Sequence, residues 1–235
     1  MAPEPQTPFE LIVGVHDLAE SPDAVGDEML SWLPMSKARP LLDEILANSR
    51  KTGQPLTITS DDAFCSDYEV LLPWLLENNL IGIFFIPTRF VGRPGRLTET
   101  QMRAMAGLGM RFGVHGASHI NWLTATPDVF AADVAEGKDT LEQILGVKVD
   151  TAAAPFGGFD GRIAAHLRAK GLTTLYTSRS GLALRKARIK PRNMLKSSQI
   201  ESVRAMSRQR GTFRDAARSH LRVLRADLQA LVQRG

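Results

Sequence analysis

The sequence has one cysteine, Cys65, among 235 residues, so it cannot form an internal disulfide. It also lacks any run close to the roughly 18 apolar residues of a membrane-spanning helix, and we expect no transmembrane segment. The first ten residues, MAPEPQTPFE, have neither the basic nor the apolar region of a secretory signal. With 43% hydrophobic and 23% charged residues, the composition is that of an ordinary globular protein, and we expect a cytoplasmic location.

Acidic residues are scarce at the carboxyl end of the chain. From Arg185 onward there are 14 Lys and Arg against 3 Asp and Glu, whereas the preceding part carries 15 against 22. From Ser197 onward, apolar residues recur at helical spacing among the arginines, which predicts a basic tail of one or two helices. We predict that this tail docks on the rest of the protein through Leu221, Leu224 and Leu228. The alternatives are attachment to an anionic membrane surface, an anionic polymer or a partner protein, while no aromatic pattern or known module supports nucleic acid.

Between these ends, short apolar strands alternate with helical patterns. This order predicts an α/β fold with a parallel sheet, as a closed barrel or a doubly wound sheet, and polar residues at many strand ends favour a distorted (β/α) barrel. We predict a disordered segment at 1–8, a barrel over 9–196 and the basic helical tail over 197–235. The predicted strands are Phe9–Val15, Thr57–Thr59, Ile81–Ile86, Met110–Val114, Asp150–Ala154 and Thr173–Thr177.

Two of these strands end in residues that bind metals. Asp61 and Asp62 follow the second strand, while His115 and His119 follow the fourth and lie four residues apart. A carboxylate and two imidazoles suit Zn²⁺, Co²⁺ or Mn²⁺ and leave positions open for water and substrate. Adjacent carboxylates are also common in loops and at helix starts, so neither motif alone defines a site.

In combination and order, the strand-end motifs resemble those of the NodB-type polysaccharide deacetylases, carbohydrate esterase family 4. Residues 59–63, TSDDA, resemble the family's Thr-Phe-Asp-Asp-Gly, and residues 115–119, HGASH, resemble its His-(Ser/Thr)-x-x-His. Residues 154–157, APFG, are similar to the motif that ends in Pro-Tyr-Gly, and residues 11–16 resemble an amino-terminal strand of one branch. The resemblance covers roughly residues 9 to 192.

The resemblance implies the NodB-type barrel and a metal-dependent hydrolysis of N-acetyl groups on a carbohydrate. By position, Asp62, His115 and His119 would bind the metal, and Asp61 would be the general base that takes a proton from the attacking water. A backbone N–H near Phe156 would help to hold the oxyanion. The implied cofactor is a divalent metal, most often Zn²⁺, with Co²⁺ or Mn²⁺ as alternatives.

The chain departs from the family pattern at the base and at the acid. Ala153 and Ala154 stand where many members have the arginine that orients the base, and no carboxyl-terminal Leu-x-x-His acid motif is present. His16, at a strand end, is our candidate for the catalytic acid, with a structural histidine as the alternative.

Four further residues are candidates for substrate binding. Trp122 is either a platform for sugar stacking or a wall of the pocket. Arg192 resembles a late arginine of some exopolysaccharide-associated members and would contact substrate, or else be a solvated arginine. Pro155 and Phe156 belong to the third motif.

We therefore predict a metal-dependent carbohydrate N-deacetylase, a hydrolase of non-peptide C–N bonds whose partner is an N-acetylated glycan. One alternative is an amidase that acts on a small molecule through the same metal and Asp61. The other is a catalytically silent barrel that binds glycan or a partner protein, because the orienting arginine and the acid are missing from their usual places.

Overall fold

The computed structural model of the chain describes residues 7–22, 31–208 and 211–232, and it describes side chains as far as residue 225. The disorder predicted for residues 1–8 falls mainly outside this part of the chain, so it stays a prediction.

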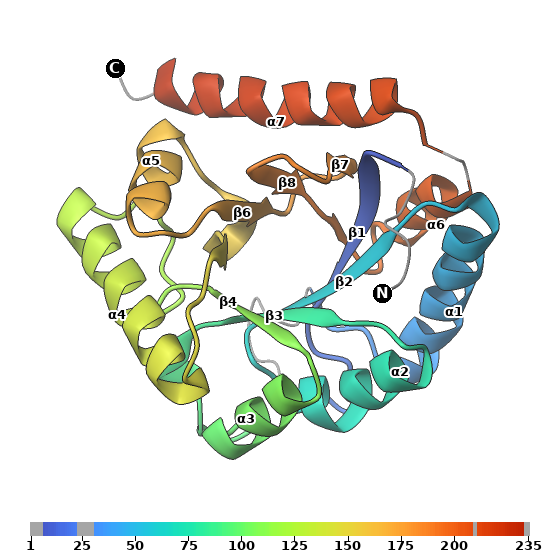
Figure 1. Cartoon of the computed structure of the whole chain (residues 1–235), viewed down its shortest axis with the longest axis horizontal. Coiled ribbons are helices and arrows are strands. Elements are labelled where there is room, and N and C mark those ends of the chain that lie inside the picture. Colours follow the sequence, from blue (N-terminus) through green and yellow to red (C-terminus); the bar gives the residue numbers. More distant parts are fainter. Residues whose placement is uncertain (1–6, 23–30, 209–210, 233–235) are drawn as a thin grey trace.

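Six strands run parallel to one another in chain order and form the wall of a barrel (Figure 1). They are rich in β-branched and aromatic residues, which favour the extended chain. Their bounds are β1 (Phe9–Val15), β2 (Leu56–Asp61), β3 (Gly82–Ile86), β4 (Arg111–Val114), β5 (Thr151–Ala153) and β6 (Thr174–Thr177).

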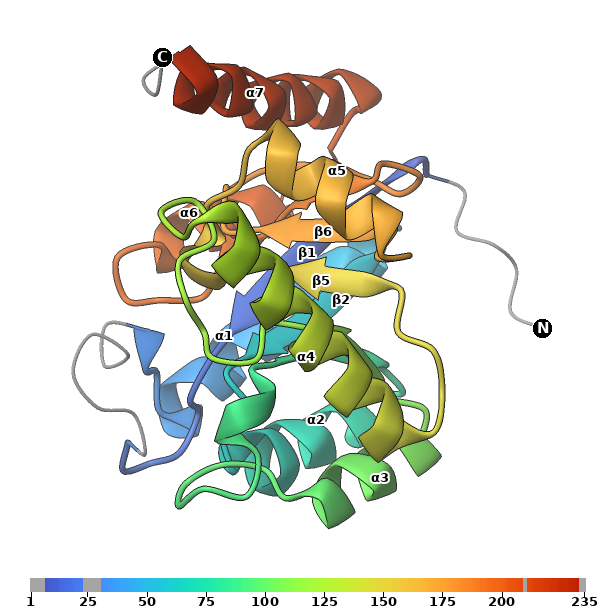
Figure 2. The ribbon, with the colours of Figure 1, turned by 90° about the vertical axis from the view of Figure 1, so that its left-hand side faces the viewer.

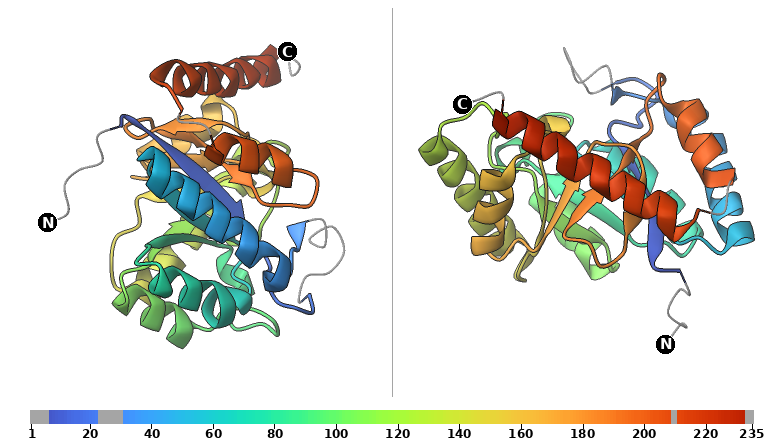
Figure 3. Two further views of the ribbon diagram at one scale, coloured as in Figure 1. Left: turned by 90° about the vertical axis from the view of Figure 1, so that its right-hand side faces the viewer. Right: turned by 90° about the horizontal axis from the view of Figure 1, so that it is seen from above.

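Helices connect these strands and lie outside the sheet, as seen from two sides in Figure 2 and Figure 3. Their ends follow the capping residues. Thr98 and Gln101 form a capping box at the start of α3, while Thr126 caps the start of α4 and Gly146, at φ 70°, caps its end. The helices up to β6 are α1 (Met35–Thr52), α2 (Leu72–Glu77), α3 (Glu99–Gly107), α4 (Pro127–Leu145) and α5 (Gly161–Ala169), with a π-helical turn (Asp67–Leu71) and 3-10 turns (Thr88–Phe90 and Pro155–Gly157).

Three short strands then bring the two ends of the sheet together. β7 (Leu182–Leu184) pairs antiparallel with β1, and β8 (Ile189–Pro191) pairs with β6. One residue later, β9 (Asn193–Met194) pairs with β1. The chain therefore bridges β6 to β1 within a few residues, and Arg192 lies at the crossing point. This nearly closed sheet confirms the predicted barrel.

Alternation along the strands separates two apolar clusters. On β1, Leu11 and Val13 pack in the large cluster under the helices, whereas Ile12 belongs to a second cluster. Since successive side chains point to opposite faces of a strand, this second cluster fills the barrel interior. Its members are Ile12, Ile83, Phe85, Ala153, Tyr176 and Ala183.

The basic tail forms α6 (Ile200–Arg208), which packs on α1, and α7 (Phe213–Val232), which lies across β7 and β8 (Figure 1). Among the described side chains of α7, those of Ala216, Ser219 and Val223 are buried. Gly181 allows this approach, because a Cβ there would lie 2.5 Å from the Ser219 side chain. α7 thus covers the place where β7 and β8 lie next to each other without being paired.

The tail therefore docks, but not through the predicted face. Leu221 is 54% exposed, so the prediction that it is buried was wrong. Leu224 is only partly buried, and the side chain of Leu228 lies outside the described residues. The reason is the close approach of the helix at Ser219, which lies against Gly181, so that a leucine at this position would hold the helix farther from β7. No helix in the described part of the chain has the length and hydropathy to cross a bilayer.

Candidate metal centre and active site

The candidate site lies where the carboxyl ends of β2, β4 and β5 meet. Five described non-glycine residues have positive φ, and four of them are at this site: Asp62, Ala63, His119 and Phe156. Such conformations cost on the order of 1–3 kcal/mol each. The concentration of strained residues at one point marks it as the functional region.

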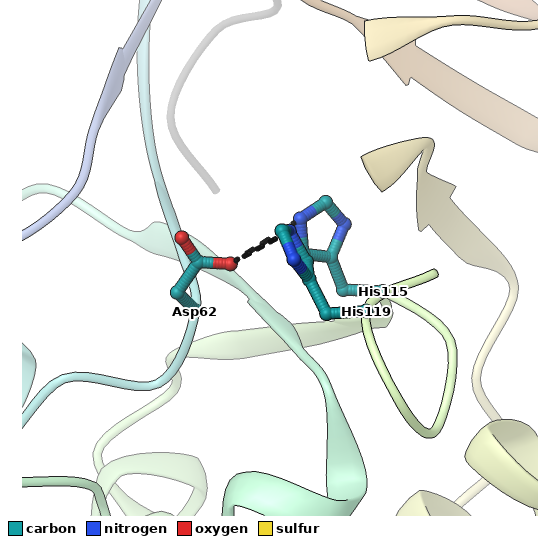
Figure 4. Close-up of side chains that lie close together, drawn as sticks. All are labelled: Asp62, His115 and His119. Carbon is teal, nitrogen blue, oxygen red and sulfur yellow. Dashed lines mark ion pairs between the residues drawn. The ribbon is translucent and has the colours of Figure 1, made fainter. Parts of the chain in front are cut away.

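Asp62, His115 and His119 come together as a three-residue cluster (Figure 4). One ligand atom from each lies within 4.8 Å of the other two. The Asp62 Oδ1 atom is 3.2 Å from Nε2 of His119 and 3.5 Å from Nε2 of His115. Asp62 and His115 are buried, whereas the His119 side chain is 16% exposed, so the cluster is reached from one side. This donor set of one oxygen and two nitrogens fits a divalent metal.

The His115 ring is oriented by the neighbouring strand. Its Nδ1 atom lies 2.8 Å from the carbonyl oxygen of Ala153 in β5. A carbonyl only accepts, so Nδ1 carries the proton and Nε2 presents its lone pair to the cluster. Burial lowers the pKa of His115 to about 3, although the charge of Asp61 opposes this shift. The imidazole is therefore neutral and ready to act as a ligand.

Asp61 faces a guanidinium rather than solvent. Arg192 has no exposed surface, and its two terminal nitrogens donate to the two carboxylate oxygens of Asp61 at 2.6 and 2.8 Å. Burial raises the pKa of Asp61, but the charge and hydrogen bonds of Arg192 outweigh burial and hold this pKa well below its usual range. Arg192 was predicted to contact substrate or solvent. The structure places it against the carboxylate of Asp61 with no exposed surface, so this prediction needs correction.

His16 also reaches the cluster. Its Nε2 atom lies 3.8 Å from Oδ2 of Asp62, and its side chain is 18% exposed. Burial lowers the pKa of His16 to about 4, with Asp61 acting in the opposite direction and Arg192 in the same one. The ring is neutral at pH 7 and lies at the site, where it can exchange a proton.

The remaining predicted residues divide into two groups. Phe156 is 66% exposed and its ring lies 4.8 Å from that of His119, so it borders the open side of the cluster, whereas Pro155 is buried. Trp122 is fully buried and its indole N–H donates to Asp133. A buried indole offers no face to a sugar, so Trp122 is part of the wall and not a binding platform.

Sequence reasoning missed Arg96. Its Nη1 atom donates to the carbonyl oxygen of Asp62 at 2.9 Å, and its guanidinium lies 3.9 Å from the centre of the Phe64 ring. These contacts support the strained turn after β2. Arg96 lies 34 residues from Asp62 in the sequence, so no local sequence pattern predicts that the two are in contact.

The lowered pKa values predict how stability depends on pH in metal-free protein. The imidazoles of His16 and His115 titrate near pH 6.5 when unfolded, but only at about 4 and about 3 when folded. The unfolded chain therefore binds more protons in this range, so the free energy of unfolding should fall as the pH drops from about 6.5 towards 4. Urea unfolding at several pH values measures how the free energy of unfolding changes with pH. In His16→Asn this change should correspond to about one fewer proton taken up on unfolding. A free energy that stays constant over this range would show that the two rings bind protons in the folded protein as they do in the unfolded chain, and would contradict the lowered pKa values.

Comparisons with known proteins agree with the motifs. The family model described as polysaccharide deacetylase matches residues 48–175. A protein of Bacillus subtilis (strain 168) named as a polysaccharide deacetylase, YxkH, is 23% identical over 117 residues. This match covers 49% of the present chain and 42% of YxkH, so the chain spans less than half the length of that relative.

Solved structures share the fold. IcaB from Ammonifex degensii matches with a TM-score of 0.72 and 20% identity over 87% of this chain and 99% of its own. The Streptococcus pyogenes deacetylase PplD, in complex with acetate, matches with a TM-score of 0.70 and 19% identity over 86% of this chain and 100% of its own. Since the family model covers more than half of the sequence, the chain belongs to the polysaccharide deacetylase family.

Proposed function

We propose that the protein is a metal-dependent hydrolase that removes N-acetyl groups from an N-acetylated carbohydrate. The observation that carries this proposal is an ionised carboxylate beside the three-residue cluster. Arg192 holds Asp61 in place, and the Oδ2 atom of Asp61 lies 3.9 Å from Nε2 of His115, a member of the cluster. A base next to a metal site is the arrangement that hydrolysis of an amide needs.

Asp62, His115 and His119 would hold the metal. A divalent ion bound there lowers the pKa of water and polarises the acetyl carbonyl. Zn²⁺ is our first choice because it prefers such a mixed set of nitrogen and oxygen ligands, and Co²⁺ or Mn²⁺ are alternatives.

Asp61 acts as the general base in this proposal. Arg192 occupies one lone pair on each of its oxygens and leaves others free to accept a proton from the attacking water. The guanidinium also keeps the carboxylate ionised and fixes its orientation. Arg192 is therefore a positioning residue that supplies what the missing motif arginine supplies in other members.

His16 and Phe156 complete the proposed site. His16 is our candidate to protonate the leaving amine, and its neutral resting state means that it must first gain a proton during the reaction. A backbone N–H near Phe156 would stabilise the oxyanion, and the exposed Phe156 ring offers a face to a sugar. The buried Pro155 shapes this edge.

The relatives support the class of substrate. PplD is a deacetylase whose structure was solved in complex with acetate, which is the product expected when an acetyl group is hydrolysed. We propose an N-acetylated polysaccharide, such as an exopolysaccharide, as the substrate of this chain. The cytoplasmic location expected from the amino-terminal residues stays a prediction.

Two alternatives use the same geometry. An amidase for small molecules would need the same metal and the same base. A silent glycan- or partner-binding barrel was suggested by the absence of the orienting arginine and of the usual acid, and the contact between Arg192 and Asp61 removes the first of these reasons. Metal content and acetate release from N-acetylated glycans distinguish the three.

We also propose that the outward face of α7 binds an anionic lipid surface. Arg214, Arg218, Arg222 and Arg225 are exposed and spaced by three or four residues, so they share the face opposite the buried Val223. The exposed Leu221 lies among them. A row of arginines around an apolar side chain is typical of a helix that binds at a lipid interface.

The metal ligands can be tested by metal content. Wild-type protein should hold about one divalent metal per chain, and Asp62→Ala, His115→Ala and His119→Ala should each lose it because each removes one of three ligands. Elemental analysis after dialysis measures this. Metal content that is unchanged in all three variants would rule out the site.

The base can be tested separately. Asp61→Asn should keep the metal but lose hydrolysis by about 10²–10⁴-fold, because an amide cannot accept the proton of water. The measurement is acetate release from a panel of N-acetylated glycans, with metal content as the control. Activity within a few-fold of the wild type would assign the base elsewhere.

The α7 surface can be tested with lipid vesicles. The protein should sediment with vesicles that contain phosphatidylserine and not with pure phosphatidylcholine, and binding should weaken towards about 0.5 M salt because screening shortens the range of the attraction. Arg218→Glu with Arg222→Glu should abolish binding without lowering acetate release. Equal sedimentation with both kinds of vesicle would contradict an electrostatic surface.

A further inference from the structure

The loop that carries His115 and His119 is held by one carboxylate from a neighbouring helix. Asp133, on the inner face of α4, is only 6% exposed. Its Oδ1 atom accepts hydrogen bonds from the backbone N–H groups of Ala117 (3.1 Å) and Ser118 (2.8 Å), and the Ala117 N–H is shared with the backbone carbonyl oxygen of Asp133 (3.0 Å). Its Oδ2 atom accepts from the indole N–H of Trp122 at 3.0 Å. A buried carboxylate is costly unless such donors surround it, and here all three come from the segment that contains the histidines or follows it.

The other side of the loop is fixed as well. The carbonyl oxygens of Gly116 and Ala117 accept from the backbone N–H groups of Thr88 (3.3 Å) and Arg89 (2.9 Å), which follow β3. With its N–H groups bound to Asp133 and its carbonyls bound to the segment after β3, the backbone between the two histidines has little freedom left.

The Asp133 carboxylate lies where a side chain on Gly116 would have to be. A Cβ on Gly116 would lie 2.1 Å from Oδ2 of Asp133, and Gly116 has φ 73°, which a side chain would strain. On the same helix, a Cβ on Gly137 would lie 2.6 Å from the carbonyl carbon of Gly116. The two glycines let α4 touch the loop directly, and the carboxylate fills the space that a side chain at position 116 would occupy.

The geometry points to Asp133 as a positioning residue for the metal ligands. This chain has glycine where the resembled motif has serine or threonine, and the Asp133 carboxylate orders the loop from outside it. Asp133 is not one of the three clustered ligands, so it acts through the backbone and through Trp122. The inference rests on the proposed metal site at Asp62, His115 and His119.

The test uses Zn²⁺ and Co²⁺ affinity of the full chain, measured by competition with a chromophoric chelator. In Asp133→Asn, one amide oxygen can still accept from the backbone, but the NH₂ group meets the indole N–H of Trp122, donor against donor. We expect the dissociation constant of the metal to rise by about 10- to 100-fold, as for other residues that orient ligands. The absorption bands of bound Co²⁺ should also shift, because they report ligand geometry. Asp139→Asn, an exposed position on the same helix, is the matched control and should change neither.

A second substitution tests the mechanism. Trp122→Phe removes the indole donor, so the double variant Asp133→Asn with Trp122→Phe should regain affinity relative to Asp133→Asn alone. An Asp133→Asn protein that melts at a lower temperature but binds both metals with wild-type affinity and an unchanged Co²⁺ spectrum would show a merely structural role and overturn the inference. A wild-type protein that binds no divalent metal would instead defeat the proposed function.

Discussion

The bond between Asp61 and Arg192 connects the closure of the barrel to its chemistry. Arg192 lies between β8, which pairs with β6, and β9, which pairs with β1, so its side chain enters the barrel only when the sheet has closed. Both side chains are almost completely buried. Breaking such a pair by removing one partner costs about 3–5 kcal/mol, because a buried charge remains uncompensated. The orientation of Asp61, the proposed base, therefore depends on the same few residues that join the two ends of the sheet.

Much of the site could be predicted because its residues lie at strand ends. Parallel strands in a barrel place their carboxyl ends at one mouth, so the short polar sequences after β2 and β4 had to come close together. This topological rule and the order of the motifs predicted that Asp62, His115 and His119 would cluster, and the structure brings them within ligand distance. The alternation of strands and helices predicted a parallel sheet, and the polar residues at successive strand ends favoured a barrel over a doubly wound sheet.

The other contacts depend on packing that no local pattern describes. Leu221 belongs to a regular apolar stripe, but the close approach of Gly181 to Ser219 decides which face of α7 is buried. For Trp122 the sequence favoured a pocket wall over a sugar platform only slightly, and it is the hydrogen bond from its buried indole to Asp133 that decides between them. One sequence signal was present: Asp133 interrupts the apolar face of α4 beside Phe130 and Val134, and a charge in such a stripe has to find partners inside the protein.

The position of Arg192 also changes how a missing motif residue should be interpreted. In the proposed mechanism Asp61 needs a guanidinium beside it, and Ala153, a small residue of the interior cluster, stands where the family motif would place that arginine. Arg192 extends over the Phe85 ring, with its guanidinium 5.2 Å from the ring centre. We interpret the two features together: alanine stands at the motif position, and Arg192, near the end of the barrel, provides the guanidinium that the motif lacks. Under the proposed function, the lack of an arginine in the motif is therefore no reason by itself to expect an inactive protein, since the segment that closes the sheet places a guanidinium on Asp61 from a different part of the chain.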